Sequence, residues 1–141
     1  MKGTTLLDVN VLLALAWPNH QHHQKAHQWF VEQSSQDWAT CALTALAFVR
    51  LSSNRAYTAD AVSPKDAAAL FTRMTAHAQH RFWSELPPLD VEVFEHAIGH
   101  QQVMDAYLVK LARHHRGRLA TFDTRVAAHA KQDGEVELIS G

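Results

Sequence analysis

The sequence of 141 residues contains a single cysteine, Cys41, together with only five glycines and four prolines. One cysteine cannot form a disulfide within the chain, which fits a reducing compartment. So few glycines and prolines exclude a low-complexity linker or a collagen-like fibre. The longest unbroken apolar run covers residues 11–17, far less than the roughly 18 residues that a membrane-spanning helix needs. We therefore expect a cytoplasmic protein with no membrane segment.

Neither sign of charge dominates the chain. Thirteen Lys and Arg residues oppose 14 Asp and Glu residues, which leaves a net charge of −1. An affinity for nucleic acid therefore has to be argued from local patches. The composition, 47% hydrophobic and 19% charged, is that of a compact globular protein. The length fits one domain over residues 1–141, so any functional site must be built on a single core.

Short β-prone runs alternate with helical patterns along the whole chain. We expect Ser63 to cap one of the helices at its start and Gly117 to end another. The expected strands cover residues 4–7, 37–41, 81–83, 119–122 and 136–139, and the expected helices cover residues 11–17, 22–33, 43–51, 64–79, 92–98, 101–114 and 125–131. This alternation predicts an α/β fold, with a mostly parallel central sheet covered by helices on both faces.

Three aspartates are expected at one edge of this sheet. Asp8 and Asp123 directly follow predicted strands, and Asp105 lies near the start of a helix whose inward positions are otherwise apolar. In open parallel sheets, sites form outside the carboxyl ends of the strands. Each acid alone is more often a helix cap or a partner of the helix dipole. Three acids expected at the same edge of the sheet favour a functional site there.

Such a cluster needs a counterion. Carboxylates about 5 Å apart repel by roughly 3 kcal/mol per pair at an effective dielectric near 20. The cluster must therefore take up protons or a divalent cation. Oxygen ligands without a cysteine partner favour Mg²⁺ or Mn²⁺ over zinc.

The charge around these acids suits a phosphodiester substrate. Residues 110–131 hold six Lys or Arg residues against one acid. A basic run is usually a solvated face, but this one flanks the candidate metal site on both sides, so we expect it to contact a phosphodiester backbone. The expected phosphate contacts are Arg116, Arg118 and Arg125. A small-molecule phosphohydrolase would instead need an Asp-x-Asp nucleophile or a glycine-rich phosphate loop, and the sequence has neither.

The eleven histidines include two pairs at i, i+4 spacing, His23 with His27 and His96 with His100. Neither pair has the Glu of a zinc-protease motif, and no third ligand is evident. We expect these histidines to be solvated or partly buried rather than bound to a metal.

Several segments of the chain resemble the motifs of the PIN-domain family, and specifically its VapC-type ribonuclease toxins of type II toxin–antitoxin pairs. The acidic segments are LLDVNVL, QVMDAYL and LATFD at residues 6–12, 102–108 and 119–123, and residues 40–44 and 48–54 extend the likeness. The resemblance implies a three-layer α/β/α sandwich and a Mg²⁺- or Mn²⁺-dependent endoribonuclease that cleaves RNA with a metal-activated water. It also implies inhibition by a small VapB-like antitoxin.

The resemblance also assigns roles to individual residues. Asp8, Asp105 and Asp123 would be the catalytic, metal-coordinating acids. Thr121 would lie beside them in the polar rim, and Asn10 would hold the Asp8 loop.

One acid of the family pattern is missing. A fourth carboxylate normally stands at the start of the helix after the second strand, and the matching position here is Ala45. This departure leaves an alternative open, namely a catalytically weakened or inactive PIN-like module that binds RNA or an antitoxin.

The first half of the chain suggests a partner surface. Its predicted helices carry Leu12, Leu13, Trp17, Trp29 and Phe30. We expect them to expose more apolar surface than a monomer needs, and therefore to form a homodimer interface, an antitoxin groove or both.

Overall fold

The computed structural model describes residues 3–140 and contains a five-stranded sheet in the order β3-β2-β1-β4-β5. Every strand pairing in this part of the chain is parallel. The chain adds strands on one side of β1 and then returns to its other side, so the order reverses between β1 and β4. The strands are β1 Thr5–Leu7, β2 Trp38–Cys41, β3 His80–Trp83, β4 Arg118–Thr121 and β5 Val136–Leu138.

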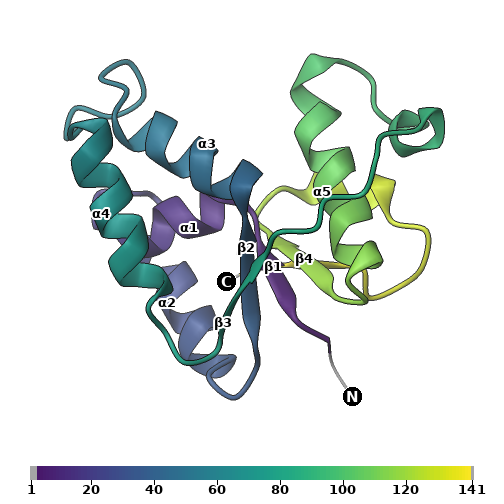
Figure 1. Cartoon of the computed structure of the whole chain (residues 1–141), viewed down its shortest axis with the longest axis horizontal. Coiled ribbons are helices and arrows are strands. Elements are labelled where there is room, and N and C mark those ends of the chain that lie inside the picture. The colour runs from purple at the N-terminus through teal and green to yellow at the C-terminus, as the bar shows by residue number, and fades with distance from the viewer. Residues whose placement is uncertain (1–2, 141) are drawn as a thin grey trace.

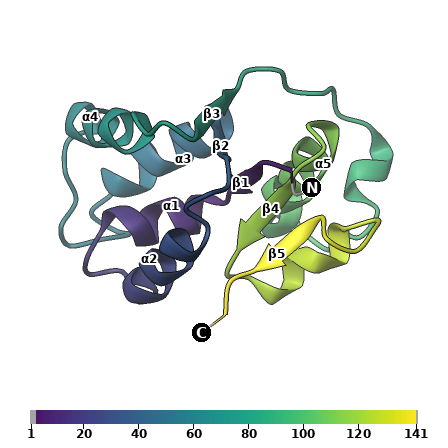
Figure 2. The ribbon, with the colours of Figure 1, turned by 90° about the horizontal axis from the view of Figure 1, so that it is seen from below.

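Helices cover both faces of the sheet. Four of them, α1 to α4, gather on one side, and α5 lies on the other (Figures 1 and 2). The helices are α1 Val9–Ala16, α2 His23–Glu32, α3 Ala42–Ser52, α4 Pro64–Thr75 and α5 Val103–His114, with 3₁₀ turns η1 Val91–Phe94, η2 His100–Gln102 and η3 Thr124–His129. This arrangement confirms the predicted three-layer α/β/α sandwich. Over residues 3–140, none of the helices has the length and apolar character needed to cross a bilayer.

Each face of the sheet has its own apolar core. Leu6 and Leu119 belong to the cluster under α5, and their neighbours Leu7 and Ala120 belong to the cluster under α1 to α4. Successive side chains of a strand point to opposite faces, so a strand covered on both faces can be apolar at consecutive positions, as at Leu6–Leu7 and Leu119–Ala120. This explains why the strands appear as short continuous apolar runs in the sequence.

Two helix ends test the capping expectations. The Ser63 hydroxyl accepts a hydrogen bond from the Asp66 backbone N–H at 3.1 Å, with Pro64 next to the cap, as expected. The helix ends at Thr75, four residues earlier than predicted. At the end of α5 Gly117 takes part in the helix ending, as predicted, but Arg116 and not Gly117 adopts the left-handed conformation, with φ at 59°.

Gly117 is required for a different reason. Its N–H donates to the Ala112 carbonyl at 2.8 Å, while the Arg116 N–H donates to the Arg113 carbonyl at 2.9 Å, which is a Schellman ending. A Cβ on Gly117 would lie 2.1 Å from the Thr4 carbonyl oxygen. The glycine therefore allows the turn before β4 to approach the chain just before β1.

The short helices of the second half also differ from the prediction. The segments expected at 92–98 and 125–131 are the 3₁₀ turns η1 and η3, and the first turn of the helix expected at 101–114 is η2. Runs this short contain the apolar residues of a helix but do not sustain its i to i−4 hydrogen bonds.

The apolar residues of the first half do not form the predicted partner surface. Leu12 and Leu13 are completely buried and Trp29 is nearly so, while Trp17 and Phe30 pack against the same cluster. The expectation that they are exposed was wrong because α1 packs against the sheet, α2 and α3 at once. In the described part of the chain, most large exposed apolar side chains lie on the connection after β3 and at the start of α5, namely Leu86, Leu89, Val91, Ile98, Val103 and Met104.

Candidate active site

Asp8 lies at the carboxyl end of β1 and caps α1. Its Oδ1 accepts a hydrogen bond from the Val9 N–H at 2.8 Å, and its Oδ2 accepts one from the Thr121 hydroxyl at 2.8 Å. The residue is only 4% exposed. Burial, helped by the charges of Asp105 and Asp123, raises its pKa from 3.8 to about 6, although both hydrogen bonds act in the opposite direction. Asp8 is thus a fixed carboxylate in an environment that disfavours its charge.

Thr121 connects two of the acids. It is the last residue of β4 and is completely buried. Its hydroxyl donates to Asp8 and accepts from the Asp123 backbone N–H at 3.2 Å. Because β1 and β4 are neighbours, this one side chain holds Asp8 and the backbone at Asp123 together across the point where the strand order reverses.

Asp105 and Asp123 complete the acidic group. Asp105 lies in the first turn of α5 and is half-buried. Its burial, and then the charge of Asp123, raise its pKa, while His129 and Arg125 oppose the shift. Asp123 caps η3 and is bound by the Arg125 guanidinium through two hydrogen bonds of 3.1 and 3.0 Å. These bonds are the main reason why the pKa of Asp123 lies below its usual value.

The acids have the donor chemistry of a site for a hard divalent cation. All the candidate ligand atoms are carboxylate oxygens. Burial, and to a smaller extent the neighbouring acidic charges, raise the pKa values of Asp8 and Asp105, and a bound cation would offset both effects. Within residues 3–140, no group of three or more His, Cys, Asp or Glu side chains lies close enough together to hold a metal ion. The Asp123 carboxylate is paired with the Arg125 guanidinium at 3.0 Å. The residues fit a cation if Asp123 exchanges its bond to Arg125 for one to the metal.

Of the three arginines predicted to contact phosphate, the structure brings only Arg125 to the acids. Arg118 stands at the start of β4, at the opposite edge of the sheet, where it pairs with Glu137 at 2.9 Å and donates to the Gly3 carbonyl. Arg116 lies in the turn just before that strand. Both residues thus lie at the amino ends of the parallel strands, opposite the acids, and their contact with RNA phosphate stays a prediction for that part of the surface.

Two further predicted positions lie on the first turns of α1 and α3. Asn10 is exposed, and its side chain makes no hydrogen bond to any described residue, so Asp8 and not Asn10 holds the start of α1. Ala45 is half-buried on α3, a helix without any Asp or Glu. The first turn of α3 is held by Thr44, whose hydroxyl accepts from the Cys41 N–H at 3.1 Å.

The histidine pair of α2 is structural. His23 Nδ1 donates to the Ala14 carbonyl at 2.7 Å, and His27 Nε2 donates to the Leu15 carbonyl at 2.9 Å. The two rings therefore satisfy carbonyl groups in the last turn of α1.

One residue near the acids was not predicted. His129, at the end of η3, is largely buried, and its interaction with Asp105 favours the protonated ring although burial lowers its pKa. No spacing motif marks His129 in the sequence. The only available signal was its place in the basic segment after Asp123.

Comparisons with known proteins agree on one family. The family model described as PIN domain matches residues 5–132. Ribonuclease VapC39 of Mycobacterium tuberculosis is 43% identical over 139 residues, which covers 96% of this chain and 99% of that protein. Ribonuclease VapC38 of the same species is 40% identical over 127 residues, or 90% of each chain. Ribonuclease VapC44 is 42% identical over 128 residues, or 89% of each.

A solved structure supports the fold. The crystal structure of PAE2754 from Pyrobaculum aerophilum superposes with a TM-score of 0.58 at 22% identity, covering 95% of this chain and 83% of that one. At this identity the likeness concerns the fold alone.

Proposed function

The chain belongs to the PIN-domain family, in its VapC branch, and we propose that it is a metal-dependent endoribonuclease that acts as the toxin of a toxin–antitoxin pair. The observation that carries this proposal is the buried Asp8 carboxylate, held by Val9 and Thr121 and affected by the charges of Asp105 and Asp123. Asn or Ser could cap α1 without burying a charge, so a buried carboxylate at this position favours a functional role.

The acids, Thr121 and Arg125 would have different roles in cleavage. Asp8, Asp105 and Asp123 would hold Mg²⁺ or Mn²⁺, whose chemistry when bound is to activate a water and to neutralise charge on the scissile phosphate. Thr121 fixes the Asp8 carboxylate and the backbone at Asp123. Arg125, once released from Asp123, would contact an RNA phosphate beside the cleaved bond.

Cleavage of a labelled RNA in Mn²⁺ or Mg²⁺ tests the proposal. Asp8→Asn keeps the helix cap and should abolish cleavage, because it removes a charged ligand. Asp66→Asn is the matched control, since Asp66 is an exposed aspartate in the first turn of α4. Equal cleavage by the natural chain and by Asp8→Asn would refute the assigned site.

The second candidate is a binding module without useful catalysis, and Ala45 is the observation that favours it. Three carboxylates with two divalent ions leave a charge of +1, whereas a fourth carboxylate would make that state neutral. The second ion should therefore bind weakly. Ala45→Glu should then raise the cleavage rate at limiting Mn²⁺ by about tenfold or more, each factor of ten being about 1.4 kcal/mol of barrier.

The Mn²⁺ titration of cleavage separates the two candidates. Equal rates for the natural chain and Ala45→Glu, both above Asp8→Asn, would show that Ala45 does not replace a catalytic acid. The absence of cleavage by both chains would favour the binding module.

The proposed partners are RNA, a small VapB-like antitoxin and a second copy of this chain, all in the cytoplasm. For the homodimer, the support is an apolar cavity of about 370 Å³ beside α5. Leu86, Leu89, Val103 and Met104 line this cavity and are all partly exposed to solvent. For the antitoxin, co-purification with the product of a small neighbouring reading frame is the direct test.

A further inference from the structure

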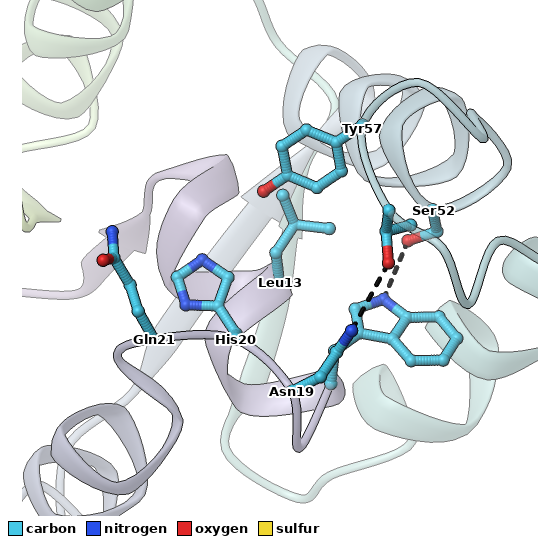
Figure 3. Close-up of a pocket in the computed structure, with 8 residues that line it drawn as sticks. Leu13, Asn19, His20, Gln21, Ser52 and Tyr57 are labelled. Carbon is cyan, nitrogen blue, oxygen red and sulfur yellow. Dashed lines mark hydrogen bonds between the residues drawn. The ribbon is translucent and has the colours of Figure 1, made fainter.

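A second cavity, of about 240 Å³, lies between the turn that joins α1 to α2 and the loop that follows α3 (Figure 3). We call it the α1–α2 pocket, and its lining includes Leu13, Trp17, Asn19, His20 and Tyr57. It is smaller than the roughly 300–1,000 Å³ of sites for drug-sized ligands. Its size therefore suits one ring system rather than an extended molecule.

Two hydrogen-bonded side chains hold the walls of the pocket in place. Trp17 Nε1 donates to the Ser52 hydroxyl at 3.0 Å, which joins the end of α1 to the end of α3. The Asn19 amide nitrogen donates to the Thr58 hydroxyl at 3.4 Å and to the Asp60 carboxylate at 3.0 Å. The turn and the loop are thus joined across the pocket, as the dashed lines in Figure 3 show for the first two of these bonds.

Other polar groups of the pocket remain available to a ligand. His20 Nδ1 accepts the His22 N–H at 3.0 Å, so the neutral His20 ring carries its proton on Nε2 and presents a donor there. Burial of His20 lowers its pKa, which favours this neutral form. The Tyr57 hydroxyl and the Gln21 amide make no hydrogen bond to any described residue, and in Figure 3 the Tyr57 hydroxyl points to the side where His20 and Gln21 lie.

The lining of the pocket indicates the chemical class of its ligand. None of the described residues that line it is Asp, Glu, Lys or Arg, so it offers no counterion to a phosphate or a carboxylate. The Tyr57 ring, 44% exposed, offers a stacking surface, and the buried Leu13 side chain forms the apolar base of the pocket. A neutral planar ring with hydrogen-bonding groups along its edge fits these features, and a nucleobase is such a ring.

The pocket also lies close to the candidate active site. The His22 ring stacks on Phe122, with ring centroids 4.5 Å apart, and Phe122 stands between Thr121 and Asp123. Leu13 lies on α1, five residues after the cap Asp8, which is roughly 8 Å along the helix axis. An RNA strand with a phosphate at the acids could therefore place a neighbouring base in the pocket.

We propose that the α1–α2 pocket binds one unpaired base of the RNA substrate and so selects the sequence that is cut. This proposal rests on the proposed ribonuclease function. Unpaired bases are the usual target of sequence-specific RNA recognition, because their hydrogen-bonding edges are free and their faces can stack.

Binding of fluorescent, short single-stranded RNAs to the non-cleaving Asp8→Asn protein is the first test. Tyr57→Ala in that background should weaken binding by about 5- to 150-fold, the usual effect of removing one aromatic that stacks on a base. Phe82→Ala is the matched control, since Phe82 is an aromatic on β3 whose exposed fraction, 53%, is close to the 44% of Tyr57. Gln21→Ala, at an exposed position, keeps the test valid if Tyr57→Ala fails to fold.

Mapping of the cut ends in a randomised RNA, in the catalytic background, is the second test. Gln21→Ala and His20→Gln should change the base preferred at one position beside the cleaved bond, while Phe82→Ala should leave it unchanged. Unchanged RNA affinity together with unchanged base preference would overturn the pocket proposal alone. A natural chain that neither binds nor cuts RNA would instead refute the ribonuclease function. Loss of antitoxin binding with RNA binding intact would also overturn the proposal, in favour of a protein ligand.

Discussion

Replacing Asp8 by Asn should stabilise the metal-free protein at neutral pH while it destroys the candidate site. A rise in the pKa of a buried carboxyl from 3.8 to about 6 corresponds to about 3 kcal/mol lost from folding stability at pH 7, at 1.36 kcal/mol for each pKa unit. Asn removes the buried charge and can still accept from the Val9 N–H as a helix cap. The Asn amide nitrogen would face the Thr121 hydroxyl, from which a neutral carboxyl could still accept a hydrogen bond, and this offsets about 1 kcal/mol of the gain. We therefore expect a net gain of about 2 kcal/mol.

The pH dependence identifies the cause of this gain. Because the pKa of Asp8 is raised in the folded state, burial of its charge lowers the folding stability only where the carboxyl is ionised in the unfolded chain. This loss of stability is small below pH 3.8, grows as the pH rises, and is complete above about pH 6. At pH 4 the cost to the natural chain is only about 0.5 kcal/mol. The advantage of Asp8→Asn should therefore be present at pH 7 and absent at pH 4.

Denaturant unfolding in the presence of a chelator, at both pH values, measures the effect. Asp66→Asn, at an exposed helix start, should gain nothing at either pH. Added Mn²⁺ at pH 7 should stabilise the natural chain and leave Asp8→Asn unchanged, because a ligand stabilises only the fold that binds it. A gain of equal size at pH 4 and pH 7, or no gain at pH 7, would refute the reasoning from charge burial.

Three further predictions concern other parts of the molecule. Arg125→Gln frees the Asp123 carboxylate, so calorimetry should show tighter Mn²⁺ binding while RNA binding weakens; unchanged Mn²⁺ affinity would contradict the competition between Arg125 and the metal. Gly117→Ala places a Cβ 2.1 Å from the Thr4 carbonyl oxygen, so the free energy of unfolding measured with denaturant should fall by about 2 kcal/mol or more. An unchanged unfolding midpoint would mean that the turn shifts freely. Leu89→Asp, at a side chain 65% exposed beside α5, should turn a homodimer into a monomer in light scattering, and a dimer that persists would place the interface elsewhere.

The sequence was sufficient to predict where the three candidate acids lie in the fold. Asp8 and Asp123 follow short apolar runs, and in a parallel sheet all carboxyl ends lie at one edge, so their proximity follows from the fold class alone. Asp105 required a different argument, namely an acid on the inward side of an otherwise apolar helix. Local pattern and fold class together were enough for these three positions.

Side-chain partners could not be predicted in the same way. Arg118 and Arg125 look alike in the basic segment, but the first lies at the amino end of β4 and the second lies beyond its carboxyl end. Whether Leu12 and Leu13 are buried depends on which elements pack against α1, and the sequence of α1 alone does not show this. The ion-pair partner of an arginine and the burial of a leucine both depend on the tertiary arrangement.

The arrangement around Asp123 explains how a metal-free fold tolerates its acids. Asp8 is held by neutral donors that offset only part of the cost of its burial, whereas Asp123 is bound by Arg125, which lowers its pKa. Arg125 is therefore the internal counterion of the group, and a cation that binds there has to displace it. Displacement would turn a positive guanidinium toward the solvent at the edge of the sheet where RNA is expected to bind. On this argument, metal binding and phosphate binding assist each other through one side chain.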